Sequence, residues 1–88
     1  MTKDTRITVG QNVRTIREEQ RITVSDAADA VGVHRSWWNY LENGAVNFTI
    51  DKLDAVARFL KVAVLDLLDE ETVYAQSGRS KAKRRKAS

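Results

Sequence analysis

The stretch of sequence that decides the fold runs from Thr23 to Gly44 and reads TVSDAADAVGVHRSWWNYLENG. Apolar residues recur every three or four positions on both sides of Gly32, which favours two short helices. Thr23 with Asp26 three residues later is typical of a helix start, and a glycine suits the left-handed residue that closes a helix. The final Asn-Gly pair predicts a stop. We therefore expect two helices joined by a tight turn, the second over residues 35–42.

Helical spacing continues on both sides of this stretch. Thr8 is expected to cap a first helix that ends near Gln20, and Thr49 to cap a fourth helix. The inward-facing residues expected on the fourth helix are Ile50, Leu53, Val56, Ala57 and Leu60. A fifth helix follows from Val64, with the acids from Asp66 onward on a solvated face. The sequence predicts an all-α, compact five-helix domain over residues 8–75, after a flexible arm over residues 1–7.

Length and composition exclude several classes of protein. The 88 residues favour one small domain, and 42% hydrophobic with 31% charged residues is ordinary for a soluble protein. The chain has no Cys and a single His, so thiolate or multi-histidine metal sites and cysteine nucleophiles are excluded. No apolar run approaches the roughly 20 residues that span a bilayer. We expect a cytoplasmic protein without cofactor, metal or membrane contact, and not an enzyme.

Charge divides the chain into two parts. Residues 1–78 carry nine Lys and Arg against twelve Asp and Glu, a net charge of −3. The remaining six cations are Arg79, Lys81, Lys83, Arg84, Arg85 and Lys86. Residues 76–88 are therefore expected to form a basic disordered tail, which would attract any polyanion in a salt-sensitive way. A solvated extension, non-specific DNA binding and a localisation signal or another anionic partner all remain open for it.

The helix over residues 35–42 has an unusual outer face. Its buried side uses Trp38 and Leu41, whereas Arg35, Ser36, Trp37, Asn39 and Tyr40 are not needed for the core. Arginine matches the acceptor pair on guanine in the major groove, asparagine matches adenine, and serine can contact bases or phosphates. An α-helix fits that groove, so these side chains indicate binding of double-stranded DNA.

In this pattern the chain resembles the lambda-repressor-like, or Xre- and Cro-type, helix-turn-helix family over roughly Val9 to Leu68. The segments that carry the resemblance are Val13-Arg14-Thr-Ile-Arg17, Ala28-x-x-Val31-Gly32-Val33, Arg35-Ser36-x-Trp38-x-x-Leu41-Glu42-Asn43-Gly44, Thr49-Ile50-x-x-Leu53 and Leu60-x-Val62-x-Val64-x-x-Leu67-Leu68. The segment from Asn47 to Leu53, which lacks proline, is similar to the small controller proteins of restriction–modification systems.

The resemblance implies roles for individual residues. Base reading falls on Arg35, Ser36, Trp37, Asn39 and Tyr40, phosphate contact on Asn43 and Asn47, and a structural ion pair on Arg17 and Glu42. Two departures weaken the expected grip on the DNA backbone. Val24 stands where the family has a polar residue that bonds to phosphate, and residues 45–48 lack the usual basic side chains. We expect the tail, with Lys83, Arg84 and Arg85, to replace these missing contacts to the DNA backbone.

Three residues allow a second interpretation. Trp38 is expected to be buried, but Trp37 could contact the groove or pack on the neighbouring turn. His34 could cap the helix or touch a phosphate; a catalytic role would need a nucleophile or ligand cluster that the sequence does not show. Arg14 could approach a phosphate or be surface charge.

One recognition helix reads too few base pairs to select a site in a genome. A two-fold dimer doubles the contacts and fixes two half-sites about 34 Å apart. The fifth helix has more apolar residues than a small core can cover. We expect the dimer interface to use Val64, Leu65, Leu68, Val73 and Tyr74. We therefore expect a homodimer on a palindromic operator that blocks or recruits RNA polymerase.

The alternative function is an antitoxin-type interaction module that neutralises a partner protein, such as a toxin, and represses its own operon. The apolar fifth helix with Trp37 or Tyr74 would then form the partner surface. Fold alone does not separate the two functions.

Overall fold

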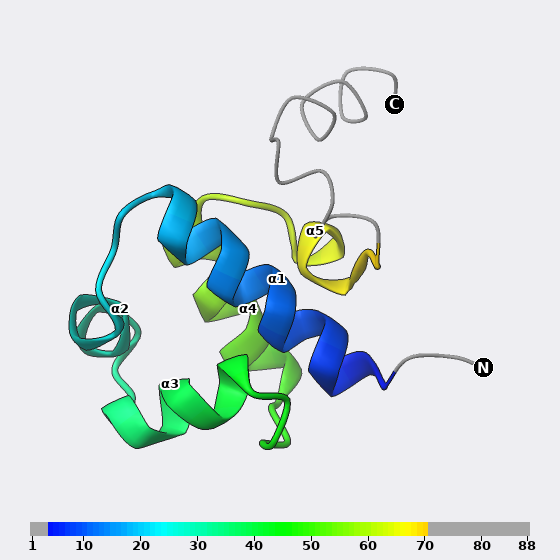
Figure 1. Cartoon of the computed structure of the whole chain (residues 1–88), viewed down its shortest axis with the longest axis horizontal. Coiled ribbons are helices and arrows are strands. Elements are labelled where there is room, and N and C mark those ends of the chain that lie inside the picture. Colours follow the sequence, from blue (N-terminus) through cyan, green and yellow to red (C-terminus); the bar gives the residue numbers. More distant parts are fainter. Residues whose placement is uncertain (1–3, 71–88) are drawn as a thin grey trace.

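The computed structural model describes residues 4–70, which form five helices (Figure 1). In chain order they are α1 (Thr5–Glu19), α2 (Val24–Val31), α3 (Arg35–Glu42), α4 (Ile50–Leu60) and α5 (Val64–Leu68). Within residues 4–70 there is no strand, so the predicted all-α, five-helix class is confirmed. The expected basic tail and the interface residues Val73 and Tyr74 lie outside the described residues.

The predicted start of the first helix was wrong by one turn. The side chain of Asp4 accepts a hydrogen bond from the Arg6 backbone N–H at 2.8 Å, and α1 begins at Thr5. Residues 5–7, expected in a flexible arm, are therefore helical. Thr8 lies inside the helix and is only 2% exposed. An aspartate caps a helix at least as well as a threonine, so the earlier cap is the one used.

The ends predicted for α1, α2 and α3 and the start predicted for α4 are confirmed. The fifth helix is shorter than predicted: α5 ends at Leu68, because Asp69, expected on the same helix, has an extended backbone. Thr23 Oγ1 accepts from the Asp26 N–H at 3.0 Å, and Thr49 Oγ1 accepts from the Lys52 N–H at 3.0 Å. Gly32 has a φ of 86°, the left-handed conformation that glycine adopts without strain. Local capping chemistry therefore sets both ends of α2 and the start of α4.

The core lies between α1 and the other helices: α1 packs against α3 and α5, and α2 packs against α3 and α4. Trp38 is fully buried and meets the ring of Phe59 edge-on, with 6.5 Å between ring centroids. The buried apolar residues are Val9, Val13, Ile16, Ala27, Ala28, Trp38, Leu41, Leu53, Val56, Ala57, Leu60 and Leu67. Every helix contributes to this cluster, and α3 packs on it through α1, α2 and the Trp38–Phe59 contact.

Two further expectations were wrong. Ile50, expected in the core, is 75% exposed, because helical side chains lean toward the N-terminus and Ile50 is the first residue of α4. Asp66, expected on a solvated face, is 5% exposed. Its carboxylate accepts a hydrogen bond from the Ala63 N–H at 3.1 Å and so caps the start of α5.

Candidate nucleic-acid interface

The turn between α2 and α3 is fixed by its backbone. The N–H groups of Gly32 and Val33 both donate to the carbonyl oxygen of Ala28, at 2.8 and 2.9 Å. Val33 is half-buried and packs against the core. The two hydrogen bonds and this apolar contact set the direction in which α3 leaves α2, as a helix-turn-helix unit requires.

His34 caps α3. Its Nδ1 accepts the backbone N–H of Ser36 at 3.1 Å and lies 2.7 Å from the Ser36 hydroxyl. Because Nδ1 acts as an acceptor, the ring proton of neutral His34 belongs on Nε2. The capping interpretation of His34 is therefore the one the geometry favours, and it leaves an Nε2–H donor for a phosphate.

The outer face of α3 carries most of the residues that were expected to read bases. Arg35, Ser36 and Asn39 are exposed, and Tyr40 is 55% exposed. Trp37 is half-buried and packs against the core, so the packing interpretation accounts for much of its ring. The face therefore presents one cation, one hydroxyl, one amide and one phenol, and this donor-rich set suits the acceptor-rich major groove.

The charge around this face favours an anionic partner. Between Ala30 and Ile50 the sole carboxylate in the sequence is Glu42, and its side chain is only 8% exposed. The exposed acids of the described residues lie on other elements, such as Glu18 on α1, Asp29 on α2 and Asp51 on α4. The chain is acidic over these residues, yet α3 and the following loop present no exposed carboxylate of their own.

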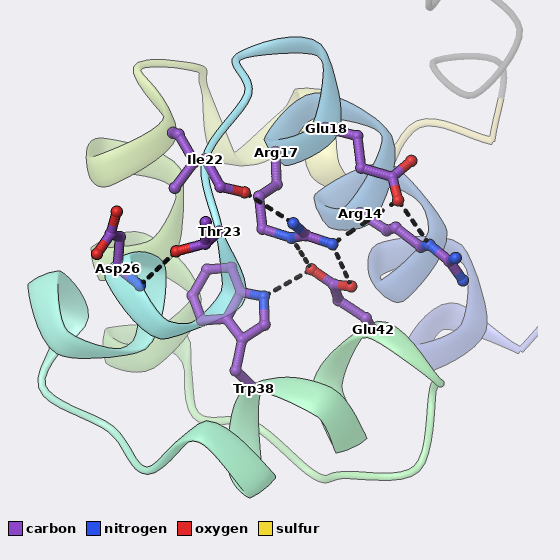
Figure 2. A network of polar contacts seen from close by, with 8 residues as sticks. All are labelled: Arg14, Arg17, Glu18, Ile22, Thr23, Asp26, Trp38 and Glu42. Carbon is purple, nitrogen blue, oxygen red and sulfur yellow. Dashed lines mark hydrogen bonds and ion pairs between the residues drawn. The ribbon is translucent and has the colours of Figure 1, made fainter.

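A largely buried ion pair holds α3 against α1 (Figure 2). Arg17 Nε donates to Glu42 Oε2 at 2.5 Å, and Arg17 Nη2 donates to Oε1 at 3.1 Å. Arg17 Nη1 also donates to the Ile22 carbonyl at 2.7 Å, and the Trp38 indole N–H donates to Glu42 Oε2 at 2.6 Å. The structure thus brings together Arg17 and Glu42, the two residues expected to pair, and adds two partners that the sequence did not suggest.

This network is suited to holding α3 in one position relative to α1. The side chains of Arg17 and Glu42 are 11% and 8% exposed. The hydrogen bonds with Glu42 raise the pKa of Arg17, against the opposing effect of its burial. A permanently charged guanidinium therefore faces a carboxylate that accepts three hydrogen bonds, and the bidentate geometry fixes the angle of α3.

Arg14, an expected phosphate contact, lies beside this network (Figure 2). Its Nε is 3.2 Å from Glu18 Oε2, one helical turn away, and both side chains are more than half exposed. The same carboxylate oxygen is 3.8 Å from Arg17 Nη2. Any phosphate contact by Arg14 would have to compete with Glu18, which favours the surface-charge interpretation.

The loop after α3 packs closely against the start of α1. Gly44 has a φ of 72°, and a Cβ added there would lie 2.9 Å from the Ile7 Cα. Asn43 and Asn47, the two expected phosphate contacts of this loop, are exposed. Asn47 Oδ1 accepts a hydrogen bond from Arg6 Nη1 at 3.1 Å. The loop after α3 and the first turn of α1 therefore lie side by side at the surface.

The expected dimer residues within α5 differ in exposure. Leu65 is 75% exposed and Leu68 is 37% exposed, whereas Val64 is half-buried against the core. Leu67, between them, is fully buried. Among the described residues of α5, the apolar side chains that are exposed are therefore Leu65 and Leu68. Lys83, Arg84 and Arg85 of the tail lie outside the described residues.

Sequence reasoning missed three residues, in α1 or at its C-cap, that join this helix to the other helices. The Asn12 side chain is fully buried, and its Nδ2 donates to the carbonyls of Leu67 and Asp69 at 2.7 and 2.9 Å. Gln20 Nε2 donates to the Leu60 carbonyl at 2.7 Å. Gly10 lies where α1 crosses the end of α3. A polar residue at a core position of the helical spacing was the signal available for Asn12.

Other kinds of site were also sought. Among residues 4–70 no group of three or more His, Cys, Asp or Glu side chains is placed to hold a metal ion. None of the five described helices has the length and apolar character needed to cross a membrane.

Comparison with known proteins gives the same picture. A family model described as a helix-turn-helix domain matches residues 8–70. The immunity repressor protein of Bacillus phage phi105 is 33% identical over 67 residues, 76% of this chain and 46% of the repressor. Control protein C.BamHI of Bacillus amyloliquefaciens is 31% identical over 74 residues, 83% of this chain and 91% of that protein. The HTH-type transcriptional regulator SinR of Bacillus subtilis (strain 168) is 36% identical over 69 residues, 75% of this chain and 62% of SinR.

The chain spans about half the length of the phage repressor but most of the control protein. In the crystal structure of the clp gene regulator ClgR from Corynebacterium glutamicum, the matching chain has a TM-score of 0.75 at 24% identity. That match covers 93% of this chain and 89% of ClgR and shows the shared fold. The turn geometry, the outward face of α3 and these relatives agree: the chain belongs to the lambda-repressor-like, Xre-type helix-turn-helix family of DNA-binding transcription regulators.

Proposed function

We propose that this protein is a sequence-specific regulator that binds a palindromic operator as a homodimer, with α3 in the major groove. The observation that carries the proposal is the outer face of α3, where Arg35, Ser36, Asn39 and Tyr40 are exposed around a helix that the Arg17–Glu42 pair holds in place. At the operator the dimer would block or recruit RNA polymerase.

Arg35 is the main base reader in this proposal, with a bidentate contact to guanine. Replacing Arg35 with Ala should relax specificity at one position in each half-site, because such a pair contributes about 1–3 kcal/mol of discrimination. The measurement is selection of bound duplexes from a random DNA pool at about 150 mM salt, where exposed charges are well screened. Wild type should enrich a two-fold motif, and Arg35→Ala should enrich the same motif with that position randomised.

Two results of this selection would contradict the proposal. If Arg35→Ala enriched the wild-type motif unchanged, Arg35 would not read a base. If wild type enriched no motif and its binding vanished as salt rose, only non-specific attraction would be present. Arg58→Ala is the matched control, because Arg58 is an exposed arginine on α4 that pairs with Asp54. It should leave every position of the motif intact.

The dimer is proposed to form through Leu65 and Leu68 of α5. Leu65→Lys should dissociate it, because each buried leucine contributes about 1.5–3 kcal/mol and the symmetry removes two of them. Sedimentation velocity of the full chain measures the change. Ile50→Lys is the matched control: Ile50 and Leu65 are both 75% exposed, so neither change should disturb the fold. A dimer that survives Leu65→Lys but not Ile50→Lys would move the interface to the start of α4.

The exposed apolar pair on α5 also fits the alternative, an antitoxin-type module that covers this surface with a partner protein. The two functions differ in the protein that covers Leu65 and Leu68. In the proposed regulator a second copy of this chain covers them, whereas in an antitoxin-type module a different protein does. Co-purification of an untagged second protein from the native source, lost in Leu65→Lys, would favour the module.

A further inference from the structure

The loop after α3 contains no basic residue, yet a guanidinium lies against it. Arg6, from the first turn of α1, donates through Nη1 to Asn47 Oδ1 at 3.1 Å, across 41 positions of sequence. The close packing of Ile7 against Gly44 brings the two segments together. The cation missing from residues 45–48 is thus supplied by α1.

The hydrogen bond fixes how the Asn47 amide is oriented. A guanidinium has only donors, so the atom of Asn47 that faces Arg6 must be the oxygen. The amide NH2 group therefore points away from Arg6 as a second donor. Arg6 and Asn47 are both exposed, so two donor groups of different chemistry lie side by side at the surface.

Arg6 already forms an ion pair with Asp4 of the same chain. Its Nη2 is 3.2 Å from Asp4 Oδ2 and its Nε is 3.4 Å from Asp4 Oδ1. Both side chains are 44% exposed, and the hydrogen bonds from Arg6 lower the pKa of Asp4. An ion pair this exposed is held weakly, so a stronger anion can replace the carboxylate.

We propose that Arg6 and Asn47 bind a phosphate of the DNA backbone, next to the base pairs that α3 reads, and that Arg6 exchanges Asp4 for this phosphate when DNA binds. The inference rests on the proposed function, since it needs α3 in the groove. Because the loop continues directly from the end of α3, a duplex on the outer face of α3 passes this pair of donors. Asp4 then lowers affinity, because its carboxylate competes with the phosphate for one guanidinium.

The test is the salt dependence of binding by the full chain to the duplex that wild type enriches. Arg6→Gln should weaken binding about fivefold at 150 mM salt and reduce the slope of log K against log salt by about 0.9 for each subunit, the effect of one phosphate contact. Arg58→Gln, the matched loss of an exposed arginine, should leave the slope unchanged. An unchanged slope for Arg6→Gln would overturn the site.

A second variant tests the exchange. Asp4→Asn keeps a side-chain oxygen for the helix cap and removes the competing charge. It should raise affinity about 1.5- to 5-fold for each subunit, the range expected for one exposed ion pair. The gain should disappear when Arg6→Gln is also present. An equal gain without Arg6 would mean that Asp4 repels DNA directly, and the exchange would be rejected.

The outcomes also separate this inference from the proposed function. If Arg35→Ala relaxes the motif but Arg6→Gln binds as wild type does at all salt concentrations, the phosphate site alone fails. If wild type enriches no motif, the proposed operator and the site that depends on it both fail.

Discussion

Replacing Glu42 with Gln should lower the free energy of unfolding by about 3 kcal/mol, the lower end of the range for breaking a buried ion pair. The amide keeps the shape of the side chain but cannot neutralise Arg17, whose side chain is 11% exposed. It also offers one acceptor oxygen where the carboxylate has two, and these now accept from both Arg17 and Trp38. Urea unfolding followed by tryptophan fluorescence measures the change.

The matched control is Glu18→Gln. Glu18 pairs with Arg14 one turn away on α1, and both side chains are more than half exposed. Its loss should change stability by less than about 0.5 kcal/mol. Equal effects of Glu18→Gln and Glu42→Gln would show that the buried network holds α3 no better than a surface pair does.

An apolar replacement separates charge from packing. The double variant Arg17→Met with Glu42→Leu removes both charges, so no uncompensated ion stays buried. It should be more stable than Glu42→Gln alone, because a buried pair replaced by apolar residues is often close to neutral. The Ile22 carbonyl and the Trp38 indole N–H lose their partners in this variant, so recovery to the wild-type value is not expected.

Most of the fold could be predicted because local chemistry determines it. Thr23, Gly32 and Thr49 end or begin helices through contacts within four residues, and such contacts are readable in sequence. The start of α1 could not be fixed the same way, since Asp4 and Thr8 both suit a cap and only packing buries Thr8. The exposure of Ile50 could not be predicted either, because it depends on how α4 packs against the other helices.

The candidate site was predictable where one helix carries it. Helical spacing alone separates the buried Trp38 from the exposed Asn39 and Tyr40. Contacts between distant segments are not visible in the spacing, and the Arg17–Glu42 pair was expected only from the family resemblance. Arg6 meets Asn47 across 41 positions, and Gln20 caps the end of α4 across 40. Such pairs depend on how the helices pack, so the sequence could indicate the exposed face of α3 but not the contact of Arg6 with Asn47.

Replacing Gly10 with Ala should also be strongly destabilising, by about 2–3 kcal/mol in urea unfolding. Helix propensity alone predicts the opposite, a gain of about 1 kcal/mol for Ala in a helix interior. A Cβ at Gly10, however, would lie 2.7 Å from the Glu42 carbonyl oxygen and closer still to that of Leu41. Both atoms belong to the backbone of α3 and cannot rotate away, so α1 and α3 would have to separate.

Gly32→Ala is the control for a glycine replaced without a clash. A Cβ there meets nothing within 4 Å, and the φ of 86° alone opposes it, at a cost of about 1–2 kcal/mol. If Gly10→Ala were as stable as wild type or more so, propensity would outweigh the contact and the helices would not be in close approach.

Gly10→Ala and Glu42→Gln should not act independently. Gly10 allows α1 to approach the end of α3, and that approach places Arg17 within hydrogen-bond distance of Glu42. A chain whose helices have already separated has little ion pair left to break. The double variant should therefore lose less free energy of unfolding than the two single variants lose together. The difference, the coupling energy, should be about 0.5–3 kcal/mol, as expected for residues in contact. Full additivity would mean that close packing and the buried network hold α3 separately.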